Sequence, residues 1–101
     1  MITESQARAL VESLVCTKPE WLPDDDELII VDDATITKPW GWVFFYASKK
    51  WMETRDIRYA IAGNAPLIVE KNSGNVIPTG TAYSTKKYIE NYELTGDPHS
   101  F

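Results

Sequence analysis

Both ends of the chain carry apolar positions that repeat with the period of an α-helix. Near the N-terminus, Thr3 and Gln6 have the spacing of a capping box, and a helix that starts there should stop before Pro19. The apolar residues that follow recur at i, i+3, i+4, i+7 and i+8, and they are Ala7, Leu10, Val11, Leu14 and Val15. This pattern predicts an amphipathic helix whose apolar side faces the core.

A second helix is predicted after Ser84, because serine is a favoured N-cap residue. The residues that share one face of this helix are Thr85, Tyr88, Ile89 and Tyr92. Gly96 and Pro98 commonly follow a helix end, so the helix should stop near them. The residues from 97 to 101 are expected to form a frayed, solvated tail.

Between these helices, short apolar runs rich in β-branched and aromatic residues predict strands. The runs lie at residues 28–31, 42–46, 67–71 and 75–79. The runs at 67–71 and 75–79 should pair with each other as a hairpin, and this is the best-supported strand pairing, because Asn72, Ser73 and Gly74 suit a short hairpin loop. Pro78 cannot donate a ladder hydrogen bond, so its strand should lie at an edge of the sheet.

This order of elements predicts an α+β fold: a small, mainly antiparallel sheet of about four strands with an N-terminal and a C-terminal helix packed on one face. Side chains alternate along a strand, so Trp42 and Phe44 should lie on one side and Val43 and Phe45 on the other. Both sides of this strand are therefore apolar. We expect either residues 49–59 or a partner protein to cover the second side.

Composition and charge narrow the class of protein. Of the 101 residues, 44% are hydrophobic and 25% are charged, which is ordinary for a globular protein and fits one domain over residues 1–101. No secretory leader or long apolar run is visible, so we expect a cytoplasmic protein without a membrane-spanning segment. The net charge of -5 repels phosphate backbones, which disfavours nucleic acid as a partner and favours a cationic protein.

Candidate residues for catalysis or metal binding are few. His99 is the only histidine and lies in the predicted tail, which excludes a histidine-based triad and a multi-histidine zinc site. Cys16, the only cysteine, cannot form an intrachain disulfide and is expected to pack as a small apolar residue. The acidic run at residues 24–27 does not match a calcium loop, and it indicates a solvated connection. In the alternative, these acids form a surface that attracts and binds a basic partner protein. We therefore predict a protein that is not an enzyme and has no catalytic, cofactor-binding or metal-binding residues.

Several segments together resemble the bacterial YrhB domain family, also called immunity protein 35. They are residues 41–51, residues 60–69, the turn that contains Gly74, residues 78–81 and residues 88–92. Their joint occurrence in this order is more specific than any one of them. The resemblance implies a small α+β protein, encoded beside a polymorphic toxin, that protects the producing cell by binding and neutralising the toxin without catalysis.

Other classes of function stay open beside this one. The main alternative is a chaperone-like or stress-related binding protein without a single dedicated toxin partner, which would suppress the aggregation of unrelated proteins. A small enzyme is disfavoured by the scarcity of histidine and cysteine. The sequence leaves open which toxin is bound and whether the protein is a monomer or a homodimer.

The partner-binding surface is predicted at the link that follows the aromatic strand. Trp51 is the proposed anchor, since tryptophan is enriched among the residues that dominate binding energy, and charged neighbours would form a polar rim. The predicted contact residues are Ser48, Lys49, Lys50, Trp51, Glu53, Arg55, Asp56 and Asn64. In the alternative reading, Trp51 covers the second side of the sheet, and Asn64 belongs to a purely structural turn at residues 63–66.

Overall fold

A computed structural model describes residues 1–15, 26–56 and 65–100 of the chain, and the α+β class predicted from the sequence is confirmed. The elements in chain order are α1 (Glu4–Val15), β1 (Leu28–Ile30), the 3-10 helix η1 (Asp32–Ala34), β2 (Ile36–Lys38), β3 (Gly41–Phe44), β4 (Tyr46–Ser48), α2 (Lys49–Thr54), β5 (Leu67–Glu70), β6 (Val76–Pro78) and α3 (Thr85–Thr95). Three of these elements, η1, β2 and α2, were not predicted. None of the helices in the described ranges combines the length and the apolar character that a membrane span requires.

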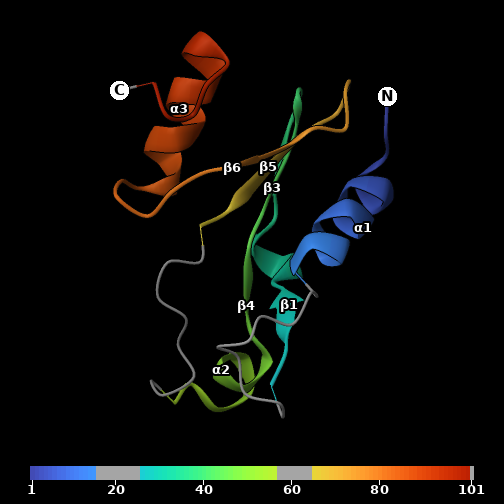
Figure 1. The fold of residues 1–101 in the computed structure, drawn as a ribbon, viewed down its shortest axis with the longest axis vertical. Helices are drawn as coiled ribbons and strands as arrows, with labels where there is room; N and C mark the ends of the chain where they lie inside the picture. The colour runs from blue at the N-terminus through green and yellow to red at the C-terminus, as the bar shows by residue number, and fades with distance from the viewer. Residues whose placement is uncertain (16–25, 57–64, 101) are drawn as a thin grey trace.

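The strands form two antiparallel sheets. The larger sheet has the order β2-β3-β5-β6, and the smaller sheet pairs β1 with β4 (Figure 1). β5 and β6 form the predicted hairpin, with Ile68 opposite Ile77. β6 also lies at an edge of the larger sheet, as expected for a strand that contains Pro78.

Phe45 divides the strand predicted at residues 42–46 into two strands. β3 ends at Phe44 within the larger sheet, whereas β4 begins at Tyr46 and pairs with β1. The Phe45 carbonyl accepts a hydrogen bond of 2.8 Å from the N–H of Val31, so the chain changes sheets while this carbonyl keeps a partner. The smaller sheet thus continues from the larger one, and β4 leads into α2 at its far end (Figure 1).

The two long helices lie on opposite faces of the larger sheet, so their predicted placement on one face is wrong (Figure 1). Val11 of α1 belongs to an apolar cluster with Trp42 and Phe44. Ile89 of α3 belongs to a second cluster with Val43, which points to the other side of β3. α3 therefore covers the apolar face that the sequence analysis left to a link or a partner. Helical periodicity shows that a helix has an apolar side, but it does not show which face of a sheet that side meets.

The predicted helix starts are confirmed by their capping contacts. The Gln6 N–H donates to the Thr3 hydroxyl oxygen (3.2 Å), and the Thr3 N–H donates to the Gln6 side-chain oxygen (2.9 Å), which completes a capping box. At α3, the Ser84 hydroxyl oxygen accepts from the N–H of Lys87 (3.2 Å). α3 ends at Gly96, whose φ of 80° is a left-handed conformation that glycine adopts readily.

The buried side of α1 is narrower than the apolar pattern predicted. Ala7, Val11 and Val15 are buried, whereas Leu10 and Leu14 keep 40% and 57% of their surface exposed. The buried residues follow one i, i+4, i+8 row, and the two leucines lie beside that row. Some apolar residues at helical spacing therefore remain exposed and do not pack into the core.

The prediction of a frayed tail is wrong for residues 97–100, which make ordered contacts, whereas Asp97, His99 and Ser100 are exposed, in agreement with the predicted solvated tail. Pro98 is fully buried, and the His99 ring packs edge-on against Tyr88 at a centroid distance of 5.6 Å. The His99 Nε2 atom also lies 2.9 Å from the Pro78 carbonyl oxygen. These contacts hold the segment after α3 against the edge strand β6.

Candidate functional site

Most of the predicted partner-binding residues meet at the corner where β4 passes into α2. Ser48 ends β4 and caps α2, because its side-chain oxygen accepts a hydrogen bond of 3.2 Å from the N–H of Trp51. α2 has 6 residues, which is too short for a stable isolated helix, so tertiary contacts must hold it in place. We call this region, residues 48–56 together with Asp26 and Glu27, the α2 corner.

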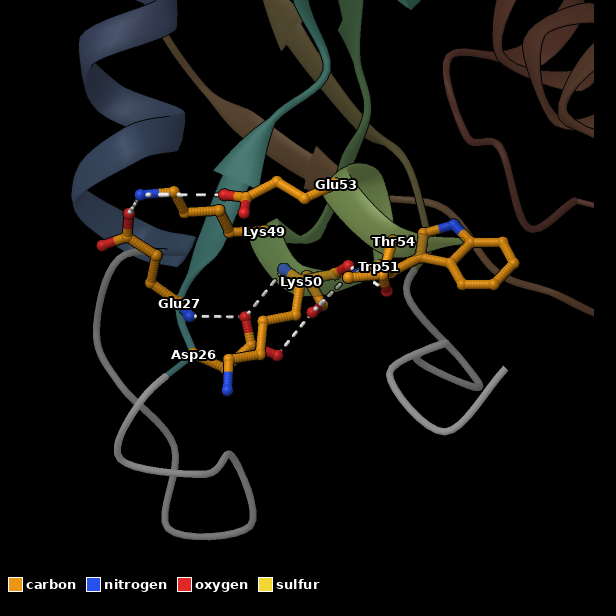
Figure 2. A network of polar contacts seen from close by, with 8 residues as sticks. Asp26, Glu27, Lys49, Lys50, Trp51, Glu53 and Thr54 are labelled. Atoms are coloured by element: carbon orange, nitrogen blue, oxygen red, sulfur yellow. Dashed lines mark hydrogen bonds and ion pairs between the residues drawn. The ribbon is translucent and has the colours of Figure 1, made fainter. Parts of the chain in front are cut away.

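Asp26 supplies the central contacts of the α2 corner from a buried position. Its carboxylate accepts hydrogen bonds from the Ser48 hydroxyl (2.5 Å), the Lys50 N–H (3.1 Å) and the Glu27 N–H (2.8 Å), as Figure 2 shows. Burial by itself would raise the pKa of Asp26, but these hydrogen bonds favour the charged form and lower the pKa below its usual value. Asp26 therefore joins the start of β1 to the start of α2.

The prediction that Asp26 lies in a solvated acidic connection is wrong, since this residue is 5% exposed. The amino-acid types in the run do not distinguish it from the neighbouring acids. Its place two residues before β1 is the only sequence signal that could have indicated its burial. Glu27 is exposed, in agreement with the prediction, and Asp24 and Asp25 lie outside the described residues.

Exposed charges form the rim of the α2 corner. The Lys49 ammonium lies 3.5 Å from the Glu27 carboxylate and 4.0 Å from the Glu53 carboxylate, on the side of α2 seen at the left of Figure 2. All three side chains are more than half exposed, so each pair contributes less than about 1 kcal/mol to stability. Charges that are paired so weakly can exchange partners at a small free-energy cost.

Trp51 points away from this charged rim (Figure 2). Its indole is partly exposed, and the Arg55 guanidinium carbon lies 5.7 Å from the ring centroid, within the range of a cation–π contact. Arg55 has a left-handed φ of 56° and closes α2 by donating its N–H to the Trp51 carbonyl (2.8 Å). Trp51 is not part of the apolar cluster that the described residues form beneath α3.

The structure separates the predicted contact residues by role. Ser48 is 1% exposed, so it positions α2 and does not present its own surface. Lys49, Glu53 and Arg55 are exposed on the α2 segment, and of these three only Arg55 lies beside the Trp51 ring. Asp56 continues the same segment, with its N–H bound to the Thr54 hydroxyl (3.1 Å). Asn64 and most of the predicted turn at residues 63–66 lie outside the described residues, as does Cys16.

Comparison with known proteins assigns the chain to a family. The family model described as immunity protein 35 matches residues 6–93. The chain belongs to the immunity protein 35 family. A protein of Escherichia coli strain K12, named uncharacterized protein YrhB, is 35% identical over 71 residues, which cover 70% of this chain and 76% of that protein. No solved structure matches the chain.

Membership of the immunity protein 35 family confirms the resemblance found in the sequence, and the match reaches from α1 to α3. It includes the whole α2 corner. Among the described residues of this family member, no group of His, Cys, Asp or Glu side chains converges in a way that could hold a metal ion.

Tyr92 of α3 and Glu70 of β5 form a pair of groups whose pKa values are both shifted. The Tyr92 hydroxyl donates to the Glu70 carboxylate (2.5 Å). Burial and this carboxylate raise the pKa of Tyr92 to about 12, and the hydrogen bonds from Tyr92 and Ser73 lower the pKa of Glu70. The geometry of this pair explains how the helix is held on the sheet.

Proposed function

We propose that this protein is an immunity protein that binds a cognate polymorphic toxin domain in a fixed stoichiometry and neutralises it in the cytoplasm of the producing bacterium. The family match over residues 6–93 is the observation that carries the proposal. The described carboxylates with shifted pKa values, Asp26, Asp32 and Glu70, are engaged in hydrogen bonds between different parts of the fold, which supports a binding role without catalysis. The proposed partner is a protein, and neither a nucleic acid, a membrane nor a cofactor takes part.

We assign the toxin contact to the α2 corner. Trp51 is the anchor, because a partly exposed tryptophan can lose its remaining surface to a partner at a low entropic cost. Arg55 beside the indole, together with Lys49 and Glu53 on the other side of α2, forms the polar rim, since these exposed charges can turn to charges on the toxin. Asp26 and Ser48 act beneath them by holding α2 in one orientation before the toxin arrives.

The charge of the whole protein supports a basic toxin surface. A net charge of -5 attracts a cationic partner over a distance and speeds association. This contribution is screened by salt, so the association rate should fall as ionic strength rises, with a smaller change in the dissociation rate.

The proposal is tested by expressing the toxin domain of the adjacent gene in a sensitive bacterium, with and without this protein. We expect growth arrest by the toxin alone, rescue by co-expression, and a complex of fixed stoichiometry when the purified proteins are mixed. Rescue must fail with an immunity protein of another toxin, which serves as the control. Continued growth arrest despite soluble, folded protein would refute the function, and suppression of aggregation of unrelated proteins would point to a chaperone-like binder instead.

A further inference from the structure

A second concave surface lies between α3 and the edge strand β2, outside the α2 corner. It is a groove of about 410 Å³ with an apolar floor made by Ile36, Phe45 and Ile89. Glu90 and Lys86 are on its α3 wall. We call this surface the α3 groove.

The α3 groove exists because α3 covers the middle of the sheet and not its β2 edge. Val43 and Ile68 in the two central strands are fully buried against α3. Ile36 and Phe45 belong to the same apolar cluster, yet both keep part of their surface exposed. The strip of apolar surface nearest β2 is therefore open to a further element.

The backbone of β2 is also open along this edge. Lys38 lies opposite Gly41 across a two-residue turn, which makes them a hydrogen-bonded pair and leaves the N–H and C=O of Thr37 directed away from β3. The opposite edge of the sheet differs, because Pro78 has no N–H and its carbonyl oxygen lies 2.9 Å from His99 Nε2. Strand addition is therefore favoured at β2 over β6.

The charges on the walls of the α3 groove indicate what kind of segment fits. Glu93 is already engaged, by the Trp40 indole N–H (3.0 Å) and by Lys38 (4.0 Å). Glu90 makes no hydrogen bond or ion pair with any described residue, so its carboxylate is available to a basic side chain. Lys86, one turn earlier in α3, carries the opposite charge and would favour one orientation of a bound segment.

We propose that the α3 groove receives an extended segment of the toxin in which an apolar residue and a basic residue stand two positions apart, so that both side chains lie on the same face of the strand. This proposal rests on the proposed function, because it takes the toxin as the partner. The segment adds a strand to β2 through the N–H and C=O of Thr37. Its side chains on the α3 side then cover Ile36 and Phe45, and its basic residue pairs with Glu90.

The test is a calorimetric titration of purified toxin domain into the full-length protein and into variants that each remove one feature. Glu90→Arg reverses the charge on the groove wall, and Thr37→Pro removes the outward N–H without breaking a bond to β3. We expect each variant to raise Kd roughly tenfold or more. Glu12→Arg is the control, since it makes the same charge change on α1, on the other face of the sheet, and the exposed ion pair with Arg8 that it removes contributes little to stability; it should alter Kd less than about threefold.

The outcomes separate this inference from the proposed function. If the parent protein binds the toxin and both Glu90→Arg and Thr37→Pro bind as the parent does, the α3 groove is not the docking site, although the immunity function stands. If the parent protein itself does not bind, both proposals are overturned. Melting curves of each variant must match the parent within a few degrees, so that a loss of affinity reports on binding.

Discussion

At the scale of single residues, Asp26 is the acceptor on which the α2 corner depends. Replacing Asp26 by Ala leaves donors of Ser48, Glu27 and Lys50 without their acceptor, so we expect the free energy of unfolding to fall by about 1–3 kcal/mol. Asp26→Asn should cost less, because one amide oxygen can still accept from both backbone N–H groups. Urea unfolding of the variants measures both changes.

Asp33 provides the comparison for Asp26, since it is an exposed acid in η1. Asp33→Ala should change the free energy of unfolding by no more than about 0.5 kcal/mol.

The pKa of Asp26 is lowered in the folded state, so the stabilisation by Asp26 is present above the unfolded pKa of about 3.9 and is lost as pH falls through the folded pKa. The difference between parent and Asp26→Ala should therefore shrink below about pH 4, and a constant difference would contradict the assignment.

The second residue-scale prediction concerns Trp51. If it is the anchor of the toxin contact, Trp51→Ala should weaken toxin binding by about 2 kcal/mol or more. Because the indole lies outside the described apolar clusters, the melting temperature should change little. Surface plasmon resonance and circular dichroism measure the two quantities, and affinity within a few-fold of the parent would rule Trp51 out.

At the scale of elements, Gly41 controls the pairing of the central strands β3 and β5. It has a φ of 153°, and a Cβ atom at this position would overlap the Val69 carbonyl oxygen. Gly41→Ala must therefore separate β3 from β5 locally, which should lower the free energy of unfolding by about 3 kcal/mol. Denaturant unfolding measures the loss.

Gly96 is the matched position for Gly41, because it also has a positive φ but no atom within 4 Å of an added Cβ. Gly96→Ala then costs only the left-handed backbone conformation, about 1 kcal/mol. A loss for Gly41→Ala that is no larger than the loss for Gly96→Ala would show that β3 and β5 can shift to accommodate the side chain.

At the scale of the whole molecule, the bond from Tyr92 to Glu70 makes the attachment of α3 depend on pH. The lowered pKa of Glu70 means that its stabilisation holds above the unfolded pKa of about 4.3 and disappears as pH falls through the folded value. The pKa of Tyr92 is raised to about 12, so its stabilisation holds below the unfolded pKa of about 10 and disappears as pH rises through 12. Melting temperatures should therefore fall on both sides of this window.

Tyr92→Phe tests this link directly, because it removes the hydroxyl and keeps the ring. We expect a loss of about 1–2 kcal/mol at pH 7, and a loss that shrinks as pH falls below the unfolded pKa of about 4.3 toward the lowered pKa of Glu70. Thermal unfolding between pH 3 and pH 11 provides the curves. A variant curve parallel to that of the parent at acidic pH would mean that Glu70 does not depend on Tyr92.

The sequence by itself determined the local features, which are the helix starts and the hairpin, and it also determined the family resemblance, which rests on short motifs. Thr3 and Ser84 start α1 and α3 because a hydroxyl at an N-cap meets backbone N–H groups only two or three residues away. The β5–β6 hairpin needs only the residues 67–78, and the family match bears out the resemblance of several short segments. These features need few contacts between distant parts of the chain, so the residue types and their spacing are sufficient.

Tertiary structure alone decided the features that depend on distant partners. The faces on which α1 and α3 lie and the division of one predicted strand at Phe45 follow from contacts between elements far apart in sequence. Asp26 is buried because Ser48 and Lys50, more than twenty residues later, meet it. A residue type states which bonds a side chain can make, but only the fold brings the partners within reach, and this is why the α2 corner was predicted as a surface while its buried support was not.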